Sequence, residues 1–219
     1  MRNNYCVNGS PRSEFFAFFE KIGTERLMGL KVSYFDGMSE ADRQEAWNFL
    51  CKDFARSSDS ITGLYLLDNL RAVALFKVEI DAPMQAAPYP ALHRALESNR
   101  LLMLTYINWV EPNPICIDAM TAFANSEFEE IRGEFAQAVP ISPVTRGVVA
   151  ALKRMILTEI EGIPLTLAIT KLMVIHGMDF DRHDPIYKSV FMSLMSNYPD
   201  DRITGMARLE QHQIPDYLD

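Results

Sequence analysis

The segment DPIYKSVFMSLMSNY, residues 184–198, carries the signals of a short amphipathic helix. Asp184 supplies a side-chain acceptor for the helix start, and Pro185 suits the first helical position, where its missing N–H costs nothing. Apolar side chains then recur at steps of three and four residues, which places them on one side of a helix. These residues are Ile186, Tyr187, Val190, Phe191, Leu194, Met195 and Tyr198. The segment predicts a helix over 185–198 that must bury one face.

The same signals recur along the chain. Glu40–Phe54 places Trp47, Leu50 and Phe54 on one helical face, and Ser39 is positioned to cap it. Ser10-Pro11, Asn113-Pro114 and Ser142-Pro143 mark further helix starts. We predict helices over 11–30, 40–56, 61–80, 91–109, 114–124, 127–139, 143–160, 164–176, 185–198 and 200–211.

These patterns favour an all-α fold of about ten short helices. Residues 64–80 are apolar around much of the circumference, so two short strands and a mixed α/β fold are the alternative there. We favour a helix, because no Asn-Gly or Asp-Gly turn divides the segment. The proline-rich residues 81–90 form the one plausible linker. The apolar segments on either side of it are too apolar to face water alone and must pack against each other, so we predict a single domain over residues 1–219.

Three segments share a pattern that resembles the second helix of HEAT-type repeats. Asp42-Arg43, Ile131-Arg132 and Asp201-Arg202 each place a small or core-facing residue three positions after the arginine and an aliphatic residue four positions later. HEAT repeats are helix pairs of about 40–47 residues that stack into arrays. The resemblance implies a HEAT-like α-α array, and an irregular helical bundle is the alternative.

Composition excludes several classes of function. The 219 residues include 21 Lys and Arg against 29 Asp and Glu, a formal net charge of −8. Binding to nucleic acid rests on clustered basic residues, and the longest basic group here is Lys153-Arg154. No window is long and apolar enough for a membrane span, and residues 1–13 lack the apolar stretch of a signal peptide. We therefore expect a cytoplasmic protein that binds neither nucleic acid nor membrane.

Motifs for catalysis are missing from the sequence. There is no Gly-x-Ser-x-Gly elbow, no Ser-x-x-Lys pair and no phosphate-binding glycine loop. We therefore predict a protein that is not an enzyme, with no catalytic residues, cofactor or metal. The alternative is an enzyme or small-molecule binder with a site between helices near His176–Asp184, where His176, Asp179 and His183 cluster. Helix capping explains most of that cluster without a ligand.

Negative charge gathers in one part of the chain. Between Asp81 and Pro140 there are eight carboxylates and three arginines, and the densest part is Glu127–Glu134. We predict that four residues bind a basic partner protein, since complementary charge steers association. They are Glu127, Glu129, Glu130 and Glu134. An adaptor or inhibitor fits this description, as does an immunity protein that neutralises a basic toxin. A homo-oligomer formed through the aromatic run Phe15–Phe19 is a further alternative.

Overall fold

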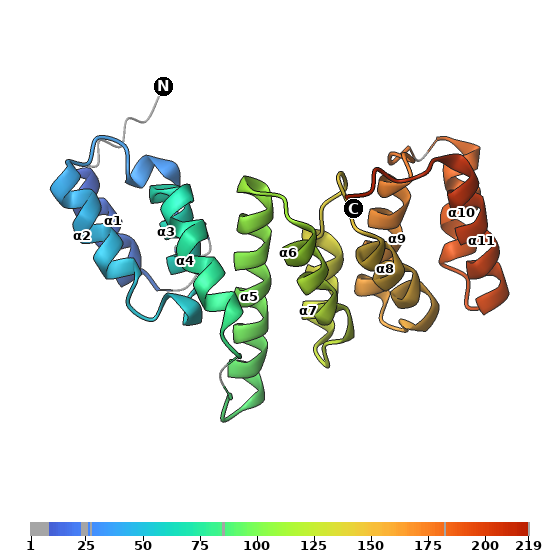
Figure 1. Cartoon of the computed structure of the whole chain (residues 1–219), viewed down its shortest axis with the longest axis horizontal. Helices are drawn as coiled ribbons and strands as arrows, with labels where there is room; N and C mark the ends of the chain where they lie inside the picture. The colour runs from blue at the N-terminus through green and yellow to red at the C-terminus, as the bar shows by residue number, and fades with distance from the viewer. Residues whose placement is uncertain (1–8, 23–25, 27, 85, 182, 219) are drawn as a thin grey trace, which may run out of the picture. The chain divides into compact units, whose positions relative to one another are not determined.

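The computed structural model describes residues 9–218 except 23–25, 27, 85 and 182. Over these residues the chain forms eleven α-helices and three short 3-10 helices, and no β-strand (Figure 1). This confirms the predicted all-α fold. Residue contacts divide the chain into two units, Met1–Ala82 and Pro83–Asp219, with the boundary inside the predicted linker 81–90. The single domain over residues 1–219 stays a prediction.

Four helices form the first unit, and a side-chain acceptor starts each of them. The helices are α1 (Pro11–Glu20), α2 (Glu40–Leu50), α3 (Ser58–Leu67) and α4 (Asn69–Asp81), with 3-10 turns at Val32–Tyr34 and Phe54–Arg56. Their N-caps are Ser10, Ser39, Ser57 and Asp68. These side chains satisfy backbone N–H groups that have no partner within the helix.

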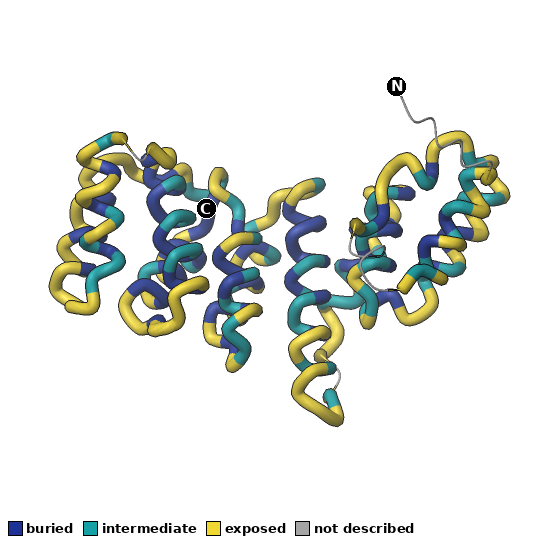
Figure 2. Tube along the Cα trace, turned by 180° about the vertical axis from the view of Figure 1, so that it is seen from behind, coloured by how far each residue is buried: buried dark blue, intermediate teal, exposed yellow. Residues whose placement is uncertain are grey.

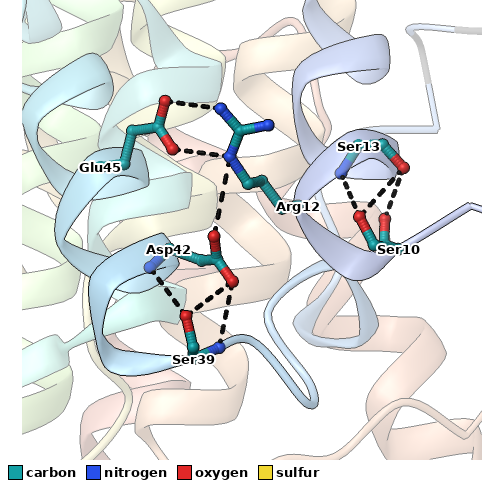
Figure 3. Close-up of polar contacts among 6 residues, drawn as sticks. All are labelled: Ser10, Arg12, Ser13, Ser39, Asp42 and Glu45. Carbon is teal, nitrogen blue, oxygen red and sulfur yellow. Dashed lines mark hydrogen bonds and ion pairs between the residues drawn. The ribbon is translucent and has the colours of Figure 1, made fainter.

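An ion pair and a capping box join the first two helices. Arg12 of α1 donates two hydrogen bonds, of 2.6 and 2.8 Å, to the carboxylate of Glu45 on α2. Asp42 lies 3.6 Å from the same guanidinium and also accepts a hydrogen bond from the hydroxyl of its cap, Ser39 (Figure 3). The start of α2 is thereby fixed both to its own cap and to α1.

Aromatic rings fill the core between α1 and α2. Phe15 and Phe18 are fully buried, and Phe15 packs edge-on against Phe49 with the ring centroids 5.9 Å apart. Phe16 and Phe19 are half-buried and also pack edge-on against Phe49. Phe15 and Phe18 therefore belong to the core, and only the exposed parts of Phe16 and Phe19 could contact a second copy of the chain.

The second unit consists of antiparallel helix pairs in two layers. Its elements are α5 (Pro90–Val110), α6 (Pro114–Ala119), the 3-10 helix η4 (Met120–Asn125), α7 (Glu129–Ala138), α8 (Arg146–Thr158), α9 (Gly162–Ile175), α10 (Pro185–Leu194) and α11 (Pro199–His212). Helix α7 packs against α5 and α9, while α8 packs against η4 and α11. Figure 2 shows that each of these helices has buried and exposed stretches, as expected where layers cover one face of each other.

Several predicted helix boundaries were wrong because local caps override the apolar pattern. The predicted helix 61–80 breaks at Asp68, which is extended and accepts the N–H of Arg71 as the cap of α4. The predicted helix 11–30 ends at Glu20. The helix predicted from Pro143 begins at Arg146, since Thr145 caps it. At Asp68 the apolar period does not reveal the break, because α3 and α4 on the two sides of it both bury apolar residues.

Two neighbouring phenylalanines of α1 test this packing. Phe18→Ala removes a fully buried ring, so the free energy of unfolding should fall by about 3–5 kcal/mol. Phe16→Ala removes the same ring from a half-buried position and should cost clearly less. Urea unfolding followed by circular dichroism measures both variants. Equal losses would contradict the described burial of α1.

Candidate functional site

The four predicted partner-binding glutamates lie at one turn of the second unit. Glu127 belongs to the turn between η4 and α7, and its side chain is 71% exposed. Glu129 and Glu130 form the first turn of α7, and Glu134 follows one turn later. Glu130 is exposed, whereas Glu129 and Glu134 are half-buried. The structure therefore brings the four carboxylates to one region but exposes them unequally.

Helix α5 supplies internal partners for three of these carboxylates. Arg94 lies 2.6 Å from Glu130, and the hydroxyl of Ser98 donates a 2.7 Å hydrogen bond to Glu134. The His93 ring lies 3.6 Å from Glu127. A hydrogen bond from its own backbone N–H, together with the charge of Arg94, lowers the pKa of Glu130. Glu130 and Glu134 thus hold α5 against α7, which leaves Glu127 as the most exposed of the four.

Further carboxylates join Glu127 at the same end of the unit. Glu161 lies in the turn between α8 and α9, and Asp200 and Asp201 open α11 after the turn from α10. Figure 1 shows these turns, together with the turn before α7, at the lower end of the second unit. We call this group the acidic edge, and it consists of Glu127, Glu129, Glu130, Glu161, Asp200 and Asp201. The predicted partner-binding residues did not include Glu161, Asp200 or Asp201, although antiparallel helices place every second turn at the same end.

A buried ion pair fixes two of these turns. The guanidinium of Arg132 on α7 donates hydrogen bonds of 2.6 and 3.1 Å to the carboxylate of Glu159, which follows the last residue of α8. Glu159 is 7% exposed. One of its oxygens also accepts the N–H groups of Ile160 and Glu161, each at 3.0 Å. The carboxylate therefore lies at the end of α8, accepts hydrogen bonds from the turn into α9 and links both to α7.

The environment of Glu159 favours its charged form. Burial alone would raise the pKa of the carboxyl. Hydrogen bonds from Arg132 and from the N–H groups of Glu161 and Ile160 outweigh that cost, so that the net effect is a lowered pKa. Arg132 shows the converse, because the hydrogen bond to Glu159 raises the pKa of its guanidinium.

Arg202 occupies, at the turn before α11, the position that Arg132 occupies at the turn before α7. Its Nε donates a 2.6 Å hydrogen bond to the carbonyl of Ser196, six residues earlier. Arg132 likewise donates to the carbonyl of Ser126, six residues before it, at 3.0 Å. Arg202 also donates to the carbonyls of Ile156 and Glu159. Two of the arginines identified in the sequence therefore occupy equivalent positions, each fastening the turn before its own helix.

The cluster at His176–Asp184 does not converge on one site. His176 is buried at the end of α9, with its Nδ1 2.7 Å from the carbonyl of Gln213. Asp179 and His183 are exposed, and Asp184 caps α10 by accepting the N–H of Ile186. Within the part of the chain that is described, no three His, Cys, Asp or Glu side chains are grouped as metal ligands.

A C-terminal strap, residues 213–218, returns from α11 to the start of α8 (Figure 1). The N–H of Val144 donates to the carbonyl of Asp216, and the N–H of Leu218 donates to the carbonyl of Val144, both at 2.9 Å. At its other end the strap is held by the contact between Gln213 and His176. The strap therefore ties the ends of α9 and α11 to the beginning of α8.

No family model, no curated protein and no solved structure matches this chain. Among the helices that are described, none has both the length and the apolar character required to cross a membrane. The function is therefore argued from the residues and their geometry.

Removing the buried carboxylate tests its role at the turns. Glu159→Ala leaves the guanidinium of Arg132 without its partner, so the free energy of unfolding should fall by about 3 kcal/mol. Glu210→Ala is the matched control, since Glu210 pairs with Lys153 at the surface and should contribute less than about 1 kcal/mol. Because folding lowers the pKa of Glu159, its contribution is complete above pH 4.5 and is lost as the pH falls through the folded value. A loss no larger than the control would contradict this role.

Acid should loosen the C-terminal strap through His176. Burial lowers the pKa of its imidazole, although the hydrogen bond to Gln213 opposes the effect. The unfolded chain therefore binds the proton first, and stability is lost as the pH falls below about 6.5. Hydrogen exchange at the amides of Val144 and Leu218, corrected for the intrinsic rate, should accelerate in that range. His176→Asn should remove this pH dependence and His183→Asn should keep it, and the reverse result would refute the assignment.

Proposed function

We propose that the chain is a non-catalytic interaction protein that binds a basic partner protein through the acidic edge of its second unit. The observation that carries this proposal is the placement of Glu127 and Glu161 in two turns, and of Asp200 directly after a third, at one end of the helix pairs. All three side chains belong to exposed residues. Carboxylates arranged in this way create an extended negative potential that attracts a positively charged surface.

The scaffold beneath the edge supports this function. Arg132 and Arg202 fasten two of the turns by hydrogen bonds to backbone carbonyls, and Glu159 fastens the third. Turns that are already fixed lose little conformational freedom when a partner binds, which improves affinity. Arg132 neutralises little of the edge, because its charge is paired with that of Glu159, whereas Arg202 donates its hydrogen bonds to carbonyl groups and keeps its positive charge.

The proposed class of protein is an adaptor or an inhibitor that acts in the cytoplasm. HEAT-like arrays present extended surfaces because each helix pair contacts mainly its neighbours, and the helix pairs of the second unit are consistent with such an array. An immunity protein that neutralises a basic toxin is one member of this class. A net charge of −8 suits a basic partner of that kind.

Charge reversal at the edge tests the proposal. The triple variant Glu127→Lys, Glu161→Lys, Asp200→Lys should slow association with a fluorescent oligolysine peptide by about tenfold or more at low salt. The salt dependence of the rate should flatten as well, because fewer charges steer the encounter. Stopped-flow fluorescence measures both effects.

The control variant makes the same change in charge elsewhere. Glu20→Lys, Asp36→Lys, Asp179→Lys alters three exposed residues that do not belong to the acidic edge and should leave most of the rate intact. Equal losses in the two triple variants would show that net charge alone attracts the peptide. That result, or the absence of binding to the wild-type chain, would overturn the proposal.

A further inference from the structure

A partly apolar hollow lies within the acidic edge. It opens between the turn from α8 to α9 and the turn from α10 to α11. Five of its ten lining residues have apolar side chains, and they come from both turns and from the helices beside them. They are Leu157, Ile160, Leu165, Met195 and Pro199. Thr158, Glu159, Asn197 and Arg202 contribute the polar groups of the wall.

Large apolar side chains around this hollow are left in solvent. Ile160 is 88% exposed and Tyr198 is 73% exposed, although both lie in turns whose backbone is fixed by hydrogen bonds. Ile163, in the first turn of α9, is 68% exposed. Apolar side chains grouped at the surface generally mark a place of association, because covering them removes apolar area from water.

The charges around the hollow restrict what can occupy it. Arg202 in the wall is 8% exposed and donates its hydrogen bonds to the carbonyls of Ser196, Ile156 and Glu159. A lysine or arginine that entered the hollow would meet this buried cation, and the one carboxylate in the wall, Glu159, is already paired with Arg132. The occupant of the hollow is therefore uncharged.

The carboxylates at the rim of the hollow favour positively charged groups. Glu161 lies on one side and Asp200 and Asp201 on the other, next to Ile160 and Pro199 respectively. An anionic ligand would be repelled by these carboxylates. A second copy of this chain would be repelled too, because its net charge is −8. Basic groups are favoured at the rim and an apolar group at the centre.

We propose that the hollow is the specificity pocket of the acidic edge and receives one apolar side chain from a basic segment of the partner protein. The inference rests on the proposed function, since the partner is the same basic protein. It adds the pattern of recognition, in which a residue such as leucine enters the hollow and flanking lysines or arginines meet Glu161, Asp200 and Asp201. Charge at the edge then supplies attraction, and the hollow selects among basic partners.

Two labelled peptides that differ in one residue test this inference. Both consist of lysines with one central residue, which is leucine in the first peptide and glutamine in the second. The leucine peptide should bind about tenfold more tightly by fluorescence anisotropy, because burial of the leucine side chain removes its apolar surface from water. Ile160→Gln should abolish this preference without affecting the fold, since Ile160 is exposed.

The matched control is Ile115→Gln, which makes the same change at a residue that is 79% exposed on α6, outside the hollow. This variant should keep the preference for leucine. The double variant Glu161→Gln, Asp200→Asn should weaken both peptides alike and leave their ratio unchanged.

The outcomes separate the two proposals. Equal, salt-sensitive binding of both peptides would overturn the specificity pocket and leave the acidic edge standing. A preference for leucine that survives Ile160→Gln would also overturn the pocket, because the leucine would then bind elsewhere. Failure of both peptides to bind the wild-type chain would overturn the proposed function together with the inference.

Discussion

A buried carboxylate must be surrounded by donors, and Glu159 imposes this requirement on the second unit. Removing a carboxylate from water costs several kcal/mol unless charge and hydrogen bonds replace the lost hydration. Arg132 supplies the charge, and the N–H groups of Ile160 and Glu161 supply further hydrogen bonds. Arg202 then binds the backbone carbonyl of Glu159. Helices α7, α8, α9 and α11 are therefore joined around one residue.

This arrangement separates the charges that hold the fold from those that face solvent. Glu159, Arg132 and Arg202 satisfy one another or nearby carbonyls. Glu161 and Asp200 follow directly from the same turns but are exposed. A surface of like charges repels itself, and that repulsion is tolerable here because the turns are held by the buried group beneath them. Negative potential at the edge then remains available to a partner.

Sequence alone could predict the parts of this structure that depend on neighbouring residues. The cap Asp184 and the stripe after it predicted α10, and the arginine pattern identified Arg132 and Arg202 before their equivalent contacts were known. Side-chain contacts between residues far apart in the sequence could not be predicted. Glu134 meets Ser98, 36 residues away, and nothing in either segment encodes that distance. The break at Asp68 could not be predicted for a local reason, because a single extended residue interrupts an otherwise continuous helical pattern.

The equivalent turns before α7 and α11 share a hydrogen-bonded scaffold on which the proposed recognition can vary. In each, a serine hydroxyl accepts the N–H of an aromatic residue two positions on, Phe128 or Tyr198. The residue between them has no part in that bond and is exposed, and it is Glu127 in one turn and Asn197 in the other. The first carries charge and the second lines the hollow. Substitution at this intervening position changes what a partner meets without disturbing the hydrogen bonds that shape the turn. Attraction by charge and selection by shape can therefore be adjusted independently.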